Sequence, residues 1–574
     1  MWSKPVVLLG FAATTLLIAA TWDHEAGKRQ LVNAWEVYHE VHCPDQTQAA
    51  IPKHLPSFLE YQETMLYHPK FGYYSSGRVN FTDDFRTFPN ALAPYFGRMV
   101  AQQVFRMWDG MRQAGTLSRE EKFTIAEFGA GNGLLAESIL DYLRQQAQDP
   151  ADPRWREFGA QAIYVTYDRA PALREAQRRR NNRFGPQFEA RDGDATNLAQ
   201  TVPPDSLKGV ILSNEMLDVF GVHKVILQPD GDAETAFVIP WLSPKTWTQI
   251  QSRLRPAIDQ IVLDGDRSIK RAFWPDEPPP GIFLSREALP SLLEALSASP
   301  DYASLAHSIH FHEVYLPARD IPDLKAHLKK YAHAYASELA RSGKGVVTYV
   351  SPGEEKFIRG AARALRAGYV ITIDYGSNWD GIITTAQPHL RTYGPGNQQS
   401  APTDLLTGLT MEHASAGQSG SRLEATPQWN ELGDIEVLAH TTSRGNPDPY
   451  RWPGLNDITT DVNFSYLAAE GQLAGLRPVY YGPQKALLSG TSISFSAKNS
   501  GWLLPRGAGE VGEWLKQFAT NAAFKVLVEQ KLQTDDAYSY PDTHPETMDV
   551  NENGLTATQR KRAAEIEQAI LNRN

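Results

Sequence analysis

The sequence predicts an α/β fold in which helices cover both faces of a mainly parallel sheet. Three observations support this prediction. Short apolar runs alternate with helical segments between residues 116 and 228, a glycine-rich turn follows the first of these runs, and acidic side chains stand at the ends of the later ones. Because ligands bind at the carboxyl ends of strands in such sheets, the pattern also predicts a binding site there.

Composition limits the class of protein. Hydrophobic residues make up 42% of the 574 residues and charged residues 21%, which is typical of a globular chain with a large core and more than one structural unit. The net charge of −10 argues against general nucleic-acid binding, because no basic excess is available to neutralise phosphates. The single cysteine, Cys43, excludes an internal disulfide, and His307, His310 and His312 have no carboxylate cluster beside them, so we expect no metal site.

The first residues form a distinct segment. Pro5–Trp22 is uncharged and largely apolar, with a length at the lower limit for a membrane-spanning helix. Ala19-Ala20-Thr21 resembles a signal-peptide cleavage site only weakly. We therefore expect residues 1–24 to be an uncleaved membrane anchor, with a cleaved signal and an organelle-targeting segment as the alternatives.

Residues 25–115 are expected to form a helical lead-in that covers the site. Ser57–Met65 and Ala93–Trp108 have helical apolar spacing, and the aromatic loop Tyr67–Tyr74 separates them. The alternating core then begins. Its predicted strands and helices are Phe123–Phe128 (strand), Leu134–Gln145 (helix), Ala162–Tyr167 (strand), Pro171–Arg180 (helix) and Gly209–Ser213 (strand).

The alternation is interrupted between Gln228 and Gly343, where several prolines, including Pro278-Pro279-Pro280, occur among mixed helices. We interpret residues 229–343 as an inserted substrate-facing or lid region. Strand patterns return at Gly345–Val350 and Tyr369–Tyr375, so the core is expected to comprise residues 116–228 and 344–395. Residues 396–574 are predicted to be a loop-rich C-terminal region with terminal helices, one of them over Val511–Gln533.

The glycine-rich turn has the sequence Glu127-Phe128-Gly129-Ala130-Gly131-Asn132-Gly133. Glycines let a backbone approach a ligand closely, at φ values that other residues resist. Dinucleotide-binding turns use G-x-G-x-x-G, whereas here the third glycine comes one residue early and Leu134 takes its place. The acidic Glu127 suits a cationic ligand better than a pyrophosphate. The turn therefore fits the amino-acid end of S-adenosylmethionine, although a plain loop is the alternative.

Two further acidic residues extend this cofactor hypothesis. Asp168 ends the second predicted strand, where a carboxylate can accept hydrogen bonds from both ribose hydroxyls. Its alternative role is a helix cap before Pro171. Asp194, in the loop Arg191–Ala195, can accept from the adenine amino group, although such residues are more often simple turn residues.

The segment Ser213–Asp218 follows the strand at Gly209–Ser213, so Asn214 and Glu215 would face the methyl group and Asn214 would also contact the cofactor. Glu215, Asp218 and the amide of Asn214 could hold a guanidinium or ammonium and strip it of water before attack. A helix cap is the alternative for Asn214. Asp374, at the end of a later strand, could help to shape the same catalytic mouth.

In these motifs the chain resembles the MidA-like methyltransferases, a family that includes the mitochondrial complex I assembly factor that methylates an arginine of a complex I subunit. The resemblance spans roughly residues 55–530. It rests on Glu127–Gly133, on Asn214-Glu215 with Asp218, and on Ile373-Asp374-Tyr375-Gly376. Further matching segments are Leu66–Pro69 with Gly72–Tyr74, Asp84-Phe85 with Thr87, Phe96-Gly97, Leu173-Arg174 with Gln177, Leu390–Tyr393, Asp457–Thr459 with Val462 and Phe464, and Phe524–Leu527.

This resemblance implies a class I methyltransferase, with a Rossmann-like sheet, S-adenosylmethionine as cofactor and a protein arginine as acceptor. A small-molecule O- or N-methyltransferase and a non-catalytic S-adenosylmethionine-binding assembly factor remain alternatives. The early third glycine disfavours a nicotinamide-dependent oxidoreductase. Since the cofactor is an intracellular metabolite, we expect a membrane-anchored protein with its soluble part on the cytosolic or matrix side, and a mitochondrial or secreted protein as the alternatives.

Overall fold

The computed structural model describes residues 53–79, 81, 87–253, 259, 262, 265–267, 269, 281–383, 389–393, 449–488, 518, 523–531 and 554–573. The apolar segment Pro5–Trp22, Cys43, Asp84-Phe85 and the expected loops between 396 and 448 lie outside these ranges. Within the described ranges, no helix is both long and apolar enough to cross a membrane. These residues divide into a larger compact unit, which contains Ser57–Ala236 and the described residues from Tyr315 onward, and a smaller one, which contains Phe237–Val314.

The larger unit is built on one mixed sheet with the strand order β14-β15-β10-β4-β1-β2-β3, and β13 pairs with β10 beside it. Strands β3, β2, β1, β4 and β10 are parallel neighbours, whereas β15 pairs antiparallel with both β10 and β14. The strands are β1 (Phe123–Phe128), β2 (Ala162–Asp168), β3 (Phe188–Asp192), β4 (Leu207–Asn214), β10 (Leu365–Ser377), β13 (Val462–Asn463), β14 (Arg477–Pro483) and β15 (Phe524–Lys531). The predicted Rossmann-like α/β sheet is therefore confirmed.

The register of the sheet places several predicted site segments at one edge. Phe128, at the end of β1, is paired with Tyr167 of β2 and with Ser213 of β4. Strand β1 is the first of the chain, yet later strands lie on both of its sides, so the strand order reverses beside it. In open α/β sheets this reversal opens a crevice at the carboxyl ends of the strands, and ligands bind there.

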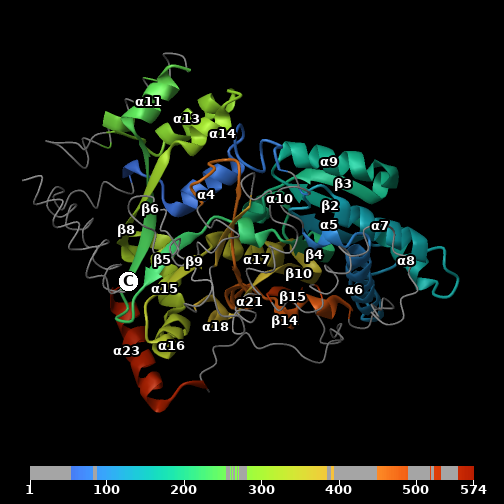
Figure 1. Ribbon diagram of the computed structural model, residues 1–574. Coiled ribbons are helices and arrows are strands. Elements are labelled where there is room, and N and C mark those ends of the chain that lie inside the picture. The colour runs from blue at the N-terminus through green and yellow to red at the C-terminus, as the bar shows by residue number, and fades with distance from the viewer. Residues whose placement is uncertain are drawn as a thin grey trace, which may run out of the picture. The chain divides into compact units, whose positions relative to one another are not determined.

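Helices cover both faces of this sheet (Figure 1). One face packs against a core formed with α6 (Tyr95–Gln113), α7 (Leu134–Gln146) and α8 (Arg154–Gln161). The other face packs against α10 (Leu198–Thr201), α17 (Pro352–Ala364) and α21 (Phe464–Leu473). Alternate residues of β1 divide between the two cores, with Phe123 and Ile125 in the first and Ala126 and Phe128 in the second. This two-sided burial explains why β1 reads as a nearly continuous apolar run.

The lead-in contributes α4 (Phe58–Tyr67) and α5 (Phe88–Ala91). Helix α4 begins with a capping box, in which the Ser57 hydroxyl accepts from the Glu60 N–H and the Glu60 carboxylate accepts from the Ser57 N–H. It ends at the aromatic loop, where Gly72 N–H donates to the carbonyl of His68. Helix α9 (Pro171–Asn181) follows β2, as predicted. The 3-10 turns of the larger unit are η1 (Asn182–Gln187), η2 (Ala195–Asn197), η3 (Leu217–Val219), η4 (Ala318–Asp320) and η7 (Gln484–Leu488).

A second set of strands lies within the larger unit. Strand β5 (His223–Leu227) pairs antiparallel with β9 (Val346–Val350) and with the first residues of β6 (Ala233–Leu242). The strand expected at Gly345–Val350 is therefore present, but it pairs outside the main sheet. Its core includes α15 (Pro322–Lys330), α16 (Ala332–Ser342), α18 (Trp379–Ile382) and α23 (Ala557–Arg573). A separate two-stranded ribbon consists of β11 (Leu390–Tyr393) and β12 (Asp457–Thr460).

The smaller unit occupies the middle of the expected insertion. The later residues of β6, Trp241 and Leu242, pair antiparallel with β7 (Ile282–Phe283). The unit also contains α11 (Pro244–Gln251), α13 (Ala288–Ser297), α14 (Tyr302–His307) and the first residues of β8 (His310–Pro317). Residues 315–343 of the expected insertion belong instead to the larger unit.

The C-terminal region differs from the prediction in one respect. We expected a helix over Val511–Gln533, but Phe524–Lys531 is strand β15, which lies between β10 and β14 in the main sheet. Seven consecutive residues of β15 are buried, because the strand is covered on both faces. A short apolar run of this kind cannot be distinguished from a buried helix by periodicity alone. The β-branched Val526 and Val528 were the available signal for a strand.

Glu529 of β15 provides a test of this packing. Its side chain is fully buried against Gly471 of α21, and neither carboxyl oxygen has a hydrogen-bond partner in the described part of the chain. Burial raises the pKa of Glu529 well above its ordinary value. The folded protein therefore binds this proton more tightly than the unfolded chain does, and the stability gained below the unfolded pKa is lost as the pH rises.

We expect Glu529→Met to stabilise the protein by about 1–3 kcal/mol at pH 8 and by less at pH 5. The substitution replaces a buried carboxyl group that has no hydrogen-bond partner with an apolar side chain of similar shape. Chemical denaturation at both pH values measures this difference. The exposed Glu120→Met serves as the control and should change stability by less than about 0.5 kcal/mol. Equal or lower stability of Glu529→Met at pH 8 would contradict the packing described here.

Candidate functional site

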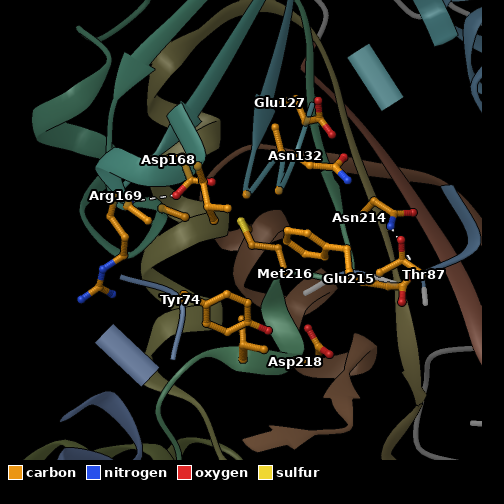
Figure 2. A pocket seen from close by; sticks show the side chains of 18 of the residues that line it. Tyr74, Thr87, Glu127, Asn132, Asp168, Arg169, Asn214, Glu215, Met216 and Asp218 are labelled. Carbon is orange, nitrogen blue, oxygen red and sulfur yellow. Dashed lines mark hydrogen bonds between the residues drawn. The ribbon is translucent and has the colours of Figure 1, made fainter. Parts of the chain in front are cut away.

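A cavity opens at the carboxyl ends of β1, β2 and β4, where the sheet order predicts a ligand site. It contains about 1200 Å³ of empty space, part of which is open to solvent. The predicted site residues that line it are Glu127, Gly129, Gly131, Asp168, Asp194, Asn214, Glu215 and Asp218. In Figure 2, Met216 lies in the middle of the view, with Asp168 and Arg169 on one side and Asn214 and Glu215 on the other.

The glycine turn forms one wall of the cavity. Gly129 and Gly131 have φ values of 70° and 50°, in the left-handed region that glycine adopts without strain. A Cβ atom added at Gly129 would lie 2.6 Å from Cγ of Met216, and one added at Gly131 would lie 3.1 Å from Cζ of Phe81. Side chains at these positions would therefore meet the neighbouring residues, so the turn depends on bare backbone.

Gly133 has a different place. It is the N-cap residue of α7 and does not line the cavity. A Cβ atom there would lie 2.8 Å from Nδ2 of Asn181 and 3.1 Å from Cα of Gln177, both on α9. The third glycine thus permits close packing between the turn and α9 and lies away from the ligand space.

Glu127 is almost fully buried at the end of β1, and its Oε2 accepts a hydrogen bond of 2.8 Å from the Tyr164 hydroxyl. Burial raises the pKa of Glu127 to about 7, against the opposing effect of the Tyr164 hydrogen bond. A cation bound in the cavity would favour the ionised carboxylate. This geometry agrees with a positively charged ligand group near the turn.

Asp168 is held from two directions. Its Oδ1 accepts from the Ala170 N–H at 2.9 Å, and its Oδ2 accepts from Nε2 of Gln177 at 3.2 Å. Burial raises the pKa of Asp168 to about 6, although both donors act in the opposite direction. The same Gln177 amide donates to the Gly131 carbonyl at 2.9 Å. Gln177 therefore ties the glycine turn to the predicted ribose-binding carboxylate.

Asp194 lines the cavity and also stabilises its own turn. Its Oδ1 accepts from the Thr196 N–H at 2.8 Å and from the Thr196 hydroxyl at 2.7 Å. Its other oxygen lies 3.8 Å from the guanidinium of Arg169. Asp194 therefore has the turn-stabilising role that was the alternative, and its Oδ2 is on the side of Arg169, which also lines the cavity.

Asn214 and Glu215 stand at the point where β4 ends. Glu215 has a φ of 47°, which is uncommon for a residue other than glycine and is often found where a functional site imposes strain. Its Oε1 accepts from Nδ2 of Asn214 and from the Phe88 N–H, both at 3.2 Å. Burial raises the pKa of Glu215 to about 8, and the nearby Asp218 carboxyl adds to this effect.

Asp374 does not line the cavity, and it contributes to the shape of the mouth from behind the cavity wall. It is fully buried, and its Oδ2 accepts from the N–H groups of Met216, Leu217 and Asp218 at 3.1, 3.0 and 3.3 Å. Burial raises the pKa of Asp374 well above its ordinary value. Asp374 therefore supports the turn that carries the other acidic residues, and it has no access to a ligand.

Asp218 lines the cavity and is buried, with 4% of its surface exposed, and its Oδ1 has no hydrogen-bond partner within the described residues. The same is true of Oδ1 of Asn214. Burial also raises the pKa of Asp218. Both oxygens are therefore buried acceptors without a donor among the described residues, in side chains that line the cavity. Because buried polar groups normally have a hydrogen-bond partner, a bound donor is the expected partner.

Several lining residues were not among the predicted site residues. Tyr67 and Tyr74 come from the aromatic loop after α4, Tyr393, Asp457 and Thr459 come from the β11–β12 ribbon, and Arg169 follows Asp168. The tyrosines and Asp457 fall in segments singled out by the family resemblance, which was the available signal.

Arg169 is the cation among the described lining residues, and its guanidinium contacts residues of the lead-in. Its guanidinium lies 3.9 Å from the centre of the Tyr67 ring and 3.3 Å from Oε2 of Glu63. The acidic lining residues are Glu127, Asp168, Asp194, Glu215, Asp218 and Asp457. The cavity is therefore strongly acidic and suits cationic ligands.

The residues present fit S-adenosylmethionine. The bare backbone at Gly129 and Gly131 admits its amino-acid end, Asp168 can accept from the ribose hydroxyls, and Asp194 can accept from the adenine amino group. The acidic lining offsets the positive charge of the sulfonium. Asn214, which directly precedes Glu215, lines the same cavity.

The chain is similar to a known protein family and to solved structures, and the family match agrees with this cofactor. Residues 99–406 match the protein family described as "Putative S-adenosyl-L-methionine-dependent methyltransferase". A Burkholderia thailandensis protein crystallised with S-adenosyl-homocysteine is 18% identical, with 91% of this chain and 94% of that chain covered and a TM-score of 0.48. A native crystal structure from the same organism is also 18% identical, with 88% and 92% covered and a TM-score of 0.47. No curated protein matches the sequence.

We expect Asp168→Asn to weaken S-adenosylmethionine binding about ten- to a hundredfold, because a hydrogen bond to a charged group contributes about 1.5–3 kcal/mol. Isothermal titration calorimetry measures the dissociation constant. Asp205→Asn, at an exposed position that does not line the cavity, is the control and should bind like the unchanged protein. Unchanged affinity of Asp168→Asn would remove Asp168 from the cofactor site.

Proposed function

This chain belongs to that family of S-adenosyl-L-methionine-dependent methyltransferases, and from this premise we propose that it methylates a nitrogen of a protein arginine side chain. The observation that carries the proposal is the acidic turn Asn214–Asp218, which follows β4 and faces the cavity beside the predicted cofactor residues. The resemblance to the MidA-like methyltransferases supports arginine as the acceptor.

The chemistry of the acceptor end favours a guanidinium. Glu215 and Asp218 supply carboxyl oxygens, Asn214 supplies an amide oxygen, and Oδ1 of both Asn214 and Asp218 awaits a donor. A guanidinium carries five N–H donors in a planar fork, so one such group can satisfy several of these acceptors at once. Among the tyrosines that line the cavity, Tyr67, Tyr74, Tyr375 and Tyr393 offer ring faces or edges to the same planar cation.

S-adenosylmethionine, when bound, supplies the electrophilic methyl group. The protein's own part is to hold the acceptor nitrogen in line and free of water, since alignment alone can account for a large share of the rate. The turn that presents Glu215 is fixed for this purpose by Asp374, and Glu215 itself is fixed by Asn214 and the Phe88 N–H. The acceptor therefore meets a rigid set of partners.

Glu215 is the group that we assign to proton removal. An arginine guanidinium remains protonated near neutral pH, so a nitrogen must lose a proton as the new bond to carbon forms. A carboxylate with a pKa of about 8 is a much stronger base than an ordinary one and lies close to the working pH. Binding of the cation lowers this pKa and favours the ionised form, so Glu215 is ready to accept the proton in the complex.

The proposed acceptor can be tested directly. We expect the purified protein, incubated with labelled S-adenosylmethionine and arginine-containing proteins and peptides, to transfer methyl groups to arginine, as mass spectrometry of the products would show. Glu215→Gln should lower kcat by about 10²–10⁴-fold. The exposed Glu175→Gln on α9 is the control. Methylation of small molecules alone would show that the acceptor is a small molecule and not a protein arginine. Cofactor binding without any methyl transfer would favour a non-catalytic assembly factor.

The pKa of Glu215 also predicts a pH dependence. Because the base must be ionised and its pKa in the free enzyme is about 8, kcat/KM should rise by up to about tenfold per pH unit below pH 8 and level off above it. Steady-state kinetics between pH 6 and 9.5 measures this profile. The control Glu175→Gln should show the same rise of kcat/KM below pH 8. A profile that is already flat from pH 6 upward would show that Glu215 is not the base.

A further inference from the structure

The β11–β12 ribbon forms a wall at the acceptor end of the cavity. Tyr393 of β11 and Asp457 and Thr459 of β12 line this wall, and the two strands pair antiparallel with Tyr393 opposite Asp457. The ribbon is separate from the main sheet, and its two strands lie between β10 and β13 in the chain. It therefore adds side chains to the cavity that the strand ends of the main sheet do not provide.

Arg391, on the same ribbon, is held by a buried ion-pair cluster. Its Nη1 contacts Oδ1 of Asp461, and the other oxygen of Asp461 lies 2.7 Å from Nδ1 of His389. The Arg391 side chain is 16% exposed and the Asp461 side chain 10%. Burial opposes ionisation of both groups, but Arg391 and His389 lower the pKa of Asp461 to about 2. Arg391 is therefore a permanent, immobilised positive charge.

This charge lies directly behind a residue of the cavity. The Arg391 guanidinium carbon lies 4.8 Å from the centre of the Tyr375 ring, within the range of a cation–π contact. Tyr375 follows Asp374 at the end of β10 and lines the cavity. The preceding residue, Asp374, accepts from the Asp218 N–H at 3.3 Å, so Tyr375 and Asp218 lie close together on the cavity wall. Burial raises the pKa of Asp218, and the nearby Tyr375 and Arg391 oppose this effect. Arg391, Tyr375 and Asp218 thus form a connected series from the ribbon to the acceptor site.

The groups that face Asp218 come from every element packed around it. Glu215 lies on its own turn, Asp374 and Tyr375 lie on β10, and Arg391 and Tyr393 lie on β11. Asp461 follows β12, and Tyr67 and Tyr74 belong to the lead-in. Among these groups Arg391 is the cation, and the carboxyls of Glu215, Asp374 and Asp461 oppose the ionisation of Asp218.

We propose that Arg391 is a positioning residue for the methyl acceptor: anchored by Asp461 and stacked on Tyr375, it fixes the cavity wall and keeps Asp218 available as an anionic partner for the acceptor cation. This inference rests on the proposed function, because it assumes a cationic acceptor. Arg391 does not line the cavity and acts through Tyr375 and the local field. Its own charge remains neutralised by Asp461, so it does not repel the acceptor strongly.

The proposal makes an opposite prediction for the two members of the ion pair. Removing the cation with Arg391→Met leaves Asp218 among carboxyls alone, so its ionisation should require a higher pH. Removing the anion with Asp461→Asn leaves the cation unopposed, so ionisation should require a lower pH. A purely structural role would instead weaken binding in both variants at every pH.

Ethylguanidinium is the probe for this test. Its dissociation constant should be measured by calorimetry on the full chain saturated with S-adenosyl-homocysteine, between pH 5.5 and 9. For the unchanged protein we expect affinity to rise with pH to a plateau. Arg391→Met should move the midpoint of this rise upward and weaken binding by up to about tenfold for a one-unit shift, at pH values below both midpoints. Asp461→Asn should move the midpoint downward, and Arg391→Lys should restore it in part.

Two measurements keep the outcomes separate. Thermal unfolding and S-adenosyl-homocysteine affinity report whether each variant is folded with an intact cofactor end. Arg144→Met is the matched control. Arg144 also lies over an aromatic ring, that of Phe184 at 4.5 Å, but this ring does not line the cavity, whereas Tyr375 does. Midpoints that move in the same direction, or not at all, in folded variants would overturn the role of Arg391. Failure of the unchanged protein to bind ethylguanidinium at any pH would overturn the cationic acceptor itself.

Discussion

Asp374 accepts hydrogen bonds from three successive backbone N–H groups of the turn after β4, and the acceptor end of the cavity is built on that turn. The turn begins at Glu215, whose positive φ is uncommon for a residue other than glycine. Such a conformation persists only where the surroundings determine it fully. Because Asp374 is buried and belongs to the neighbouring strand β10, the carboxyls of Glu215 and Asp218 are fixed relative to the sheet.

The cavity brings together several carboxyl groups whose ionisation is disfavoured by burial, and a cationic ligand can offset this effect. Burial raises the pKa of Glu127, Asp168, Glu215 and Asp218, so these groups tend to hold protons when no cation is near. A sulfonium at one end and a guanidinium at the other would restore their ionised forms. With the proposed acceptor, the site would select by charge at both ends, and proton release should accompany binding. Among the described lining residues Arg169 is the single cation, and it already contacts Glu63 and Tyr67.

Supporting residues outside the core motifs decide how these carboxyls are held. Gln177 connects Asp168 to the glycine turn, the Phe88 N–H from the lead-in fixes Glu215, and the β11–β12 ribbon closes the acceptor end. These contributions come from the segment before β1, from α9, and from the ribbon between β10 and β13. The methyltransferase core provides the cofactor end, whereas the added segments provide much of the acceptor end.

The sequence by itself determined the alternating core and the cofactor end. Strands β1, β2 and β4, the glycine turn and the placement of Asp168, Asp194, Asn214 and Glu215 beside one cavity follow from local periodicity and from parallel strands whose ends meet at one edge. Tertiary structure alone decided that β15 is a strand, that β9 pairs outside the main sheet, that Gly133 serves packing, and that Asp374 supports a turn without reaching the cavity. These outcomes depend on contacts between residues far apart in the chain. A one-dimensional pattern records which residues are apolar or acidic, but not which distant backbone group or helix each of them meets.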